Sequence, residues 1–196
     1  MSAYTSTHVS LLARLVQGTD STVWQEFQER YGELIRRFGR RQGLQPADCD
    51  DVLQDVLLAL TRAMPGFVYD PALGKFRSYL KTIALRAVFK KKFQHRAPLP
   101  LEHIEEATRA ASVDETIEQH WESEWRDYHV RRALKVAEAE FNATDRSAFE
   151  RYAVAGEDAR HVAEALGLSI DQVHQAKSRI LKRLTRLIEQ QVSEEG

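Results

Sequence analysis

Hydrophobic residues recur every three or four positions through most of the chain, the spacing that places them on one face of an α-helix. Short stretches rich in glycine, proline and small polar residues interrupt this pattern. Hydrophobic and polar residues almost nowhere alternate as they do in a β-strand. The pattern therefore predicts an all-α protein, with helices over residues 10–17, 22–42, 46–64, 75–96, 116–141 and 146–154.

Residues 158–187 contain two amphipathic segments separated by a tight turn, which is the sequence form of a helix-turn-helix. Ala163 is small, as is needed where two helices cross closely. Gly167 suits the positive φ of the turn, and Ser169 can cap the second helix by accepting a backbone N–H bond. The small core between the two helices is expected to contain Val162, Leu166, Leu168 and Val173.

The second helix of this motif has one apolar and one basic face, and no acid lies between residues 172 and 188. An acid-free basic face beside a helix-turn-helix predicts DNA binding, with cations on phosphates and the residues of the first turns on base edges. The alternative is an exposed basic helix of an ordinary bundle. Lys177 is in phase with the apolar face, and we expect its amine to reach solvent from the core edge. The predicted DNA-binding residues are Gln172, Gln175, Arg179, Lys182, Arg183 and Arg186.

The predicted helix at 46–64 carries one unusual residue on its polar side. Its core face contains Cys49, Leu53, Val56, Leu57, Leu60 and Met64. Leu58 lies on the opposite side among Asp51, Gln54, Asp55 and Arg62. An exposed leucine with a polar rim predicts a protein-binding patch. A solvated face with one stray leucine fits the spacing equally well.

The predicted helix at 75–96 contains eight lysine or arginine residues and no acid. Aromatic residues are interleaved with these cations. Cations neutralise phosphates and aromatic rings stack on bases, so this composition predicts binding of single-stranded or melted nucleic acid. The alternative is that the aromatics belong to the core, which we expect for Phe76 but not for Tyr79. The aromatic residues are Phe76, Tyr79, Phe89 and Phe93.

Composition limits the remaining possibilities. The 196 residues carry a net charge of −1 and one cysteine, Cys49, so no disulfide framework or paired-cysteine zinc site is expected. No apolar run is long enough to span a membrane, and the start of the sequence lacks a signal-peptide pattern, so we expect a cytoplasmic protein. Residues 102–124 hold eight acids and one base. We therefore predict two small helical domains, 1–96 and 118–196, joined by an acidic linker at 97–117 with room for a short helix.

The order of these segments resembles that of a bacterial RNA polymerase sigma factor of the extracytoplasmic-function (ECF) type. Residues 48–58, with the sequence Asp-Cys-Asp-Asp-Val-Leu-Gln-Asp-Val-Leu-Leu, resemble the polymerase-binding helix of sigma region 2. Residues 69–84 resemble the loop and helix that melt and read the −10 element, and residues 163–184 resemble region 4, which reads the −35 element. Residues 15–20 and the helix after them also match the opening of the family.

The resemblance implies a factor that binds core RNA polymerase and directs promoter recognition and melting, without catalysis or a cofactor. The implied polymerase-binding residues are Asp48, Asp51, Gln54, Asp55 and Leu58. The implied −10 residues are Phe67, Lys75, Arg77, Tyr79, Lys81, Arg86 and Lys90. The glutamines and cations of the helix-turn-helix, given above, would bind the −35 element. Besides polymerase and promoter DNA, the implied partners are an anti-sigma factor or a Ser/Thr kinase that would act on Thr61.

Two other functions fit parts of the sequence. A stand-alone helix-turn-helix transcriptional regulator would use residues 158–187, but it leaves the leucine-and-acid helix and the basic aromatic helix unexplained. An enzyme acting on nucleic acid, such as a recombinase, would need a carboxylate pair, a metal-ligand cluster or an activated serine. The sequence shows none of these patterns.

Overall fold

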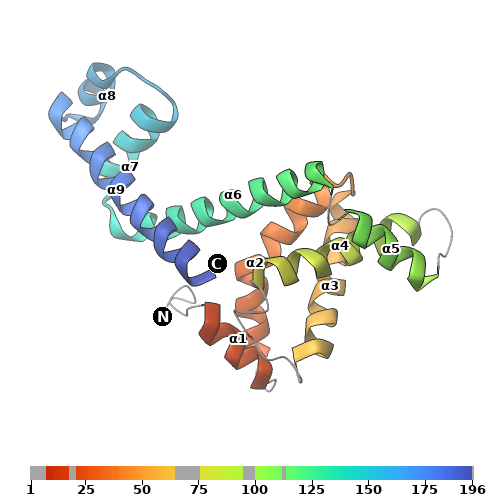
Figure 1. Ribbon diagram of the computed structural model, residues 1–196. Coiled ribbons are helices and arrows are strands. Elements are labelled where there is room, and N and C mark those ends of the chain that lie inside the picture. Colours follow the sequence, from red (N-terminus) through yellow and green to blue (C-terminus); the bar gives the residue numbers. More distant parts are fainter. Residues whose placement is uncertain (1–7, 18–20, 65–75, 95–99, 112–113, 196) are drawn as a thin grey trace. The chain divides into compact units, whose positions relative to one another are not determined.

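All regular elements in the described part of the chain are helices, as the hydrophobic spacing predicts (Figure 1). The computed structural model describes residues 8–17, 21–64, 76–94, 100–111 and 114–195. The elements are α1 (His8–Gln17), α2 (Ser21–Arg41), α3 (Pro46–Ala63), α4 (Phe76–Gln94), α5 (Leu101–Ala111), α6 (Glu115–Glu140), α7 (Ala143–Phe149), the π-helical turn η3 (Glu150–Val154), α8 (Ala159–Leu166) and α9 (Ile170–Glu195).

The helices form two compact units whose boundary differs from the predicted one. Unit 1 contains residues 1–128 and 194–196, and unit 2 contains residues 129–193. The start of α6 belongs to unit 1 because Trp121, Trp125 and Tyr128 are buried in the same cluster as the residues of α2 and α4. The stretch predicted as an acidic linker contains α5, whose Thr108 and Ala111 are buried. The predicted division at 97–117 is thus replaced by a boundary inside a helix.

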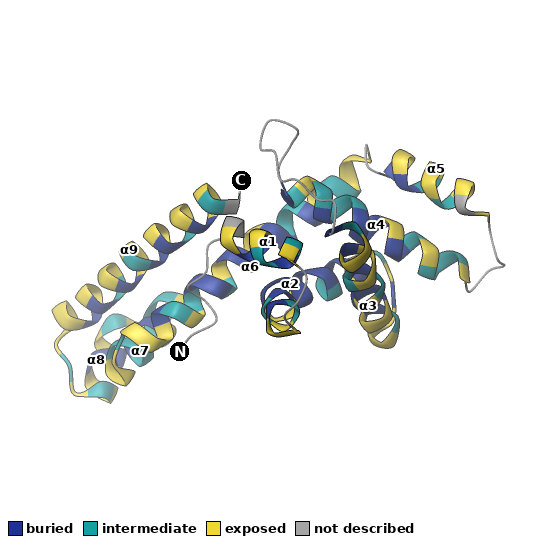
Figure 2. Ribbon diagram, turned by 90° about the horizontal axis from the view of Figure 1, so that it is seen from below, coloured by how far each residue is buried: buried dark blue, intermediate teal, exposed yellow. Residues whose placement is uncertain are grey.

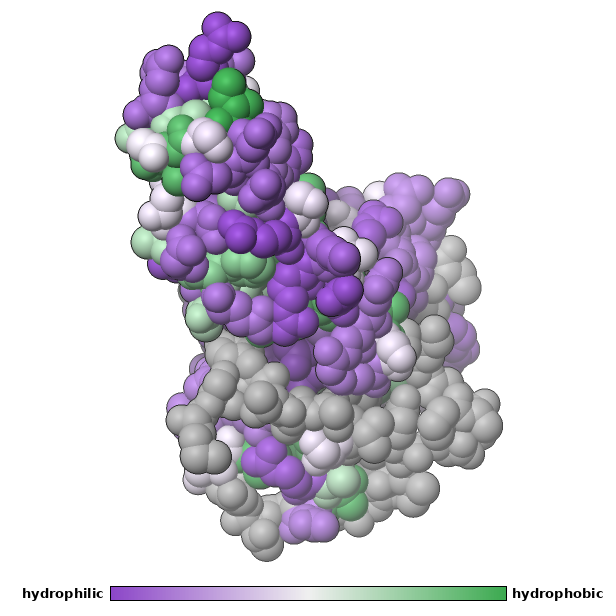
Figure 3. Space-filling view, turned by 90° about the vertical axis from the view of Figure 1, so that its left-hand side faces the viewer, coloured by the Kyte–Doolittle hydropathy of each residue, from purple (hydrophilic) through white to green (hydrophobic). Residues whose placement is uncertain are grey.

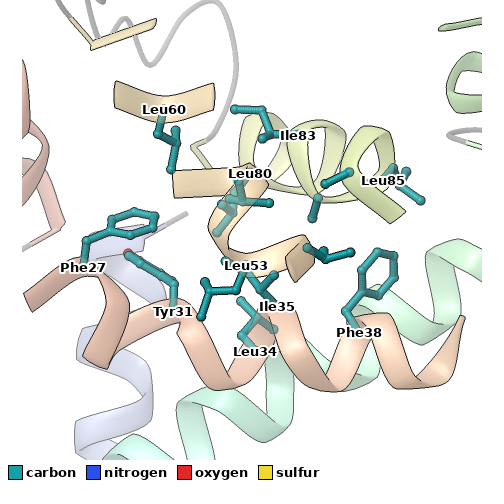
Figure 4. Packing of buried hydrophobic residues seen from close by; sticks show 14 of the residues in the cluster. Phe27, Tyr31, Leu34, Ile35, Phe38, Leu53, Leu60, Leu80, Ile83 and Leu85 are labelled. Atoms are coloured by element: carbon teal, nitrogen blue, oxygen red, sulfur yellow. The ribbon is translucent and has the colours of Figure 1, made fainter. Parts of the chain in front are cut away.

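The core of unit 1 lies between α2, α3 and α4 (Figure 4). Gly43 ends the α2 segment with a φ of +84°, which glycine adopts without steric cost, and Pro46 begins α3 where its missing N–H is not needed. The apolar stripe of α2 is buried throughout, as are the predicted core residues of α3 except Leu57, which is half-buried. The buried residues of α2 that form this stripe are Val23, Phe27, Tyr31, Leu34, Ile35 and Phe38.

Unit 2 contains the helix-turn-helix that the sequence predicts. Gly167 has a φ of +66°, and Ser169 Oγ accepts a hydrogen bond from the backbone N–H of Gln172 at 3.1 Å. Ala163 is 4% exposed and packs in a cluster with Val162 and Val173. Buried residues follow one face of α9 while the other face is exposed (Figure 2). The predicted turn is therefore confirmed, and it positions α9 with its polar side toward solvent.

The predicted helix at 146–154 proves to be two elements. Asn142 caps α7 by accepting a hydrogen bond from the backbone N–H of Asp145 at 2.8 Å. A π-helical turn follows, in which the N–H of Ala155 reaches the carbonyl of Glu150 at 2.8 Å. Such wider turns are short and interrupt ordinary α-helices. The segment ends at Gly156, which has a φ of +73°.

Candidate nucleic-acid and protein interfaces

The structure places an exposed leucine on the polar face of α3, as the spacing predicts. Leu58 is 48% exposed, although its neighbours Val56 and Leu60 are fully buried. Asp51 and Gln54 on the same face are exposed, and Asp55 is half-buried. A large apolar side chain held open beside polar groups is suited to a partner that covers it.

The acids of α3 are paired with lysines of α4, which the sequence did not reveal. Lys91 Nζ lies 2.5 Å from Asp51 Oδ2 and 3.4 Å from Asp48 Oδ1. The hydrogen bond that Lys91 donates to Asp51 is the main cause of the raised pKa of Lys91. Lys90 Nζ binds both carboxylate oxygens of Asp55 at 3.0 Å. The predicted polymerase face and the predicted −10 face are therefore joined by ion pairs within unit 1.

A groove of about 240 Å³ lies beside Leu58 and is formed by α3, α4 and α5. Leu58, Ile83 and Ile104 are among the apolar residues that line it. Arg86, a predicted −10 residue, lies at its edge and is exposed. An apolar floor with charged edges can accept one side chain of a protein partner.

Two cations of α4 contact the start of α6 rather than solvent. Arg77 pairs with Glu122, and Lys81 donates to Glu118. The guanidinium carbon of Arg77 also lies 5.4 Å from the centre of a Trp125 ring. Burial lowers the pKa of Arg77. These predicted −10 residues are present on one helix face, but part of α6 occupies that face.

The aromatic residues of α4 divide between core and surface. Phe76 is buried, as expected, and Tyr79 is half-buried, with a pKa raised by burial. Phe89 and Phe93 are half-buried and stack with ring centres 6.1 Å apart. The predicted −10 residues Phe67 and Lys75 lie outside the described residues.

The polar face of α9 in unit 2 is exposed, and three of its six predicted DNA-binding residues are exposed and take no part in its ion pairs or its N-terminal cap. Arg179 is exposed but pairs with Asp145 at 2.9 Å, and Arg183 is half-buried and pairs with Glu140 at 2.6 Å. Gln172 is exposed, yet its Oε1 accepts a hydrogen bond from the Ser169 N–H at 2.7 Å. Gln175, Lys182 and Arg186 are exposed.

Lys177 confirms the expectation that it lies at the edge of the core. It is half-buried, and its Nζ lies 4.8 Å from the centre of the Tyr152 ring. His174 packs edge-on against the same Tyr152 ring, with ring centres 5.1 Å apart. Lys177 thus contacts an aromatic face of unit 2 rather than standing on the open side of α9.

The decisive comparison concerns unit 1. Residues 27–96 match the family model of sigma-70 region 2. The matched segment holds all of α3 and α4, including Leu58, the paired acids and the basic residues. It is less than half of the 196-residue chain. The region 2 match supports a sigma factor and fits a DNA-binding role in transcription initiation.

The other comparisons add little to the region 2 match. A solved structure described as CnrH in complex with the cytosolic domain of CnrY is similar, with 22% identity and a TM-score of 0.37. The similarity covers 92% of this chain and 96% of that chain. A TM-score this low does not establish a shared arrangement. No curated protein matches the sequence.

Two absences hold for the described residues alone. None of their helices is long and apolar enough to cross a membrane. Nor do those residues bring together three or more histidine, cysteine, aspartate or glutamate side chains that could hold a metal ion. The surface drawn in Figure 3 is mostly hydrophilic where residues are described, with small hydrophobic areas between.

The sequence did not predict that α6 packs against α2 and α4. A signal for it was present, because Glu118 and Glu122 are four residues apart, as are Trp121 and Trp125. This spacing places an acidic edge next to an aromatic stripe on one side of a helix. The stripe indicated a buried face, but not which helices would cover it.

Proposed function

We propose that the chain is a sigma factor of the ECF type, which binds core RNA polymerase and directs promoter recognition and melting. The observation that carries this proposal is the region 2 match over residues 27–96, in which an open leucine on α3 and a basic helix, α4, lie side by side. A stand-alone DNA-binding regulator would need unit 2 alone. It would not need either of these features.

In this proposal α3 provides the contact with polymerase. Leu58 inserts into the partner, and the polar rim of Asp48, Asp51, Gln54 and Asp55 surrounds it. Burying a leucine that is 48% exposed in the free chain adds favourable apolar contact. The lysines that pair with these acids partly neutralise the negative charge of the rim. We therefore expect burial of Leu58 to contribute more to the binding free energy than charge attraction does.

The second and third contacts are with promoter DNA. The basic helix α4 binds the melted −10 strand through phosphates, with Tyr79, Arg86 and Lys90 on the same helix. The open side of α9 binds −35 duplex, where Lys182 and Arg186 hold phosphates and Gln175 reads a base edge. Separate contacts on the two units allow one chain to bind two promoter elements at once.

Regulation by a partner is a further part of the proposal. An anti-sigma factor would act by covering one of these surfaces. Thr61 is exposed and its hydroxyl donates to the Leu57 carbonyl at 2.9 Å. A phosphate there would add about −1.5 to −2 charge to a helix that already holds four aspartates, Asp48, Asp50, Asp51 and Asp55. The native acids make an anti-sigma factor the better supported regulator.

The experiment is co-elution of the full chain with core polymerase on size exclusion, followed by run-off transcription on a promoter library. Leu58→Ala should lower the affinity for core polymerase at least tenfold, as expected when an apolar anchor contributes more than about 1.4 kcal/mol to binding. Leu181→Ala removes a leucine of similar exposure, 44%, from α9 and serves as the matched control. Absence of co-elution by the unaltered chain, together with binding to duplex DNA, would instead support the stand-alone regulator.

A further inference from the structure

The first half of α6 contacts the rest of unit 1 through two different edges. Its aromatic edge is buried: Trp121 packs edge-on against Phe38 with ring centres 5.0 Å apart, and Tyr128 stacks on Tyr31 at 5.5 Å. Its acidic edge faces α4 through Glu118 and Glu122. The aromatic edge fixes where the helix lies, and this position brings two carboxylates onto the basic helix.

The acidic edge meets the cations that the proposed −10 contact requires. The side chains of Lys81 and Arg77 are only 14% and 21% exposed, whereas the two glutamates are 43% and 37% exposed. Each glutamate thus lies outside its cation and shields it from solvent. A carboxylate has the same charge sign and the same hydrogen-bonding capacity as a phosphate oxygen, so it occupies the position that a DNA phosphate would take.

We propose that the Glu118–Glu122 edge of α6 is an internal occupant of the nucleic-acid face of α4, and that single-stranded DNA must displace it. This inference rests on the proposed function, because it assigns α4 to the melted strand. In the free chain the edge lowers the affinity of α4 for single strands. Binding to polymerase and promoter would favour the displaced state, because DNA binds this state more tightly than the state in which the edge covers α4.

The contact between the first half of α6 and the rest of unit 1 leaves buried polar atoms of the described residues without hydrogen bonds. This is expected of a contact that DNA can displace. Trp121 Nε1 and Glu124 Oε2 are buried and have no hydrogen-bond partner among the described residues. Buried polar groups without partners oppose burial. Glu124 Oε1 does bind Arg41, at 2.5 Å, so the helix is held in place by this pair and by the aromatic edge. Half-exposed ion pairs such as those of Glu118 and Glu122 add little to folding stability.

The first test measures binding of a short labelled oligothymidylate to the full chain without polymerase. Replacing both acids in E118Q/E122Q should raise the affinity roughly 5- to 25-fold at about 0.1 M salt, since each released cation adds about 0.7 to the salt slope for single strands. The control E102Q/E106Q changes the net charge equally through exposed glutamates of α5. It should leave the affinity within twofold of the unaltered chain.

A quadruple variant locates the effect. Adding R77Q and K81Q to E118Q/E122Q should return the affinity and the salt slope to those of the unaltered chain. If the ion pairs serve folding alone, E118Q/E122Q lowers thermal stability and leaves DNA affinity unchanged, and the inference is overturned. If R77Q/K81Q weakens DNA binding while E118Q/E122Q does not strengthen it, the glutamate edge does not compete with DNA, but α4 still binds the −10 strand. If no substitution on α4 alters DNA affinity, the proposed −10 face itself fails.

A tether supplies a second measurement that does not touch α4. Gln42 Nε2 and His120 Nδ1 lie 3.3 Å apart, so cysteines at these positions in a Cys49→Ala background can be joined by a short bis-maleimide. Cys49 is the single cysteine of the chain, and its removal prevents other cross-links. The joined protein should bind single strands several-fold more weakly than the same protein with the two cysteines separately capped. Equal affinity of the two forms would show that DNA binds without moving α6.

Discussion

Lys90 on α4 donates to both carboxylate oxygens of Asp55 on α3, at 3.0 Å each. Asp55 is a predicted polymerase-binding residue and Lys90 a predicted −10 residue, and each neutralises the other. A partner of either side chain must compete with this pair. The two proposed surfaces of unit 1 are therefore linked through one contact.

The first prediction follows from this link. Asp55→Asn should weaken co-elution with core polymerase by up to about tenfold, because the rim loses an acid, and should strengthen single-strand binding, because Lys90 is released. Lys90→Gln should have the two opposite effects. Both side chains are part-exposed, 28% and 45%, so unfolding free energies should change by only about 0.2–1 kcal/mol.

The measurements are co-elution titrations and oligonucleotide anisotropy on the same protein preparations. Arg37→Gln is a suitable control, because its partner Glu33 belongs to the same helix, α2, and lies 2.7 Å away. Changes of equal sign in both assays for Asp55→Asn would contradict the linkage.

A second prediction concerns the start of α9. Ser169 and Gln172 form a reciprocal cap in which each side chain binds the backbone N–H of the other, at 3.1 and 2.7 Å. Ser169→Ala should lower the free energy of unfolding of unit 2 by about 1 kcal/mol. Gln172→Ala should act in the same direction, and this loss would obscure any effect on DNA reading.

Gln172→Glu separates the two roles, since glutamate also serves at the third position of such a cap. It should keep the unfolding free energy of the unaltered chain while changing −35 binding, because a carboxylate repels phosphate. Selection from a randomised −35 library measures base preference, and urea unfolding measures stability. Unchanged preference in both Gln172→Glu and Gln175→Ala would place base reading on other residues.

Features that depend on neighbours in the sequence were predictable. The apolar stripe of α2 and the turn at Gly167 and Ser169 follow from helical spacing, backbone sterics and capping, which act over a few residues. The exposure of Leu58 followed from the same spacing. The choice between a binding patch and a stray leucine did not, because spacing carries no information about partners.

Features that depend on distant residues were not predictable in this way. The pairs Lys90–Asp55 and Lys81–Glu118 join residues 35 and 37 positions apart. The aromatic stripe of α6 could be recognised as buried, but the sequence did not show that α2 covers it. The sequence therefore predicts that the second domain begins at 118, whereas unit 1 extends through Tyr128. The acidic composition of 102–124 suggested a linker, although part of its charge is neutralised by contacts made in the folded chain.

A third prediction concerns acid stability in unit 2. Hydrogen bonds from Arg183 lower the pKa of Glu140 below its ordinary value of 4.5. A carboxylate with a lowered pKa stabilises the fold above its unfolded pKa, and this contribution is lost as the pH falls through the folded value. Because the side chains are 36% and 38% exposed, we expect only about 0.2–1 kcal/mol. Glu140→Gln should thus lower stability at neutral pH and leave it unchanged well below pH 4.

Urea unfolding followed between neutral pH and about pH 3 checks this expectation. Glu138→Gln, two residues away on the exposed side of α6, is the matched control and should not alter the pH dependence. A difference between Glu140→Gln and the unaltered chain that persists in acid would exclude the ion pair as its source.

The last prediction tests how closely α2 and α3 pack. Gly39 is buried in α2, and a Cβ added there would lie 3.1 Å from Cys49 Sγ on α3. Alanine favours a helix by about 1 kcal/mol over glycine, but overpacking a core costs about 1–3 kcal/mol. Gly39→Ala should therefore be neutral or lower the free energy of unfolding by up to about 2 kcal/mol. In a Cys49→Ala background, which removes the sulfur, the same substitution should instead raise it. Gly32→Ala supplies the control on the same helix, because the atoms nearest to its added Cβ belong to the side chains of Arg36, Leu53 and Gln28, at 3.3 Å or more. It should be neutral or stabilising in both backgrounds.

Urea unfolding of the four combinations of Gly39→Ala and Cys49→Ala gives the coupling energy directly. A coupling energy near zero would mean that the two helices separate slightly at this point and do not hold Cys49 against Gly39.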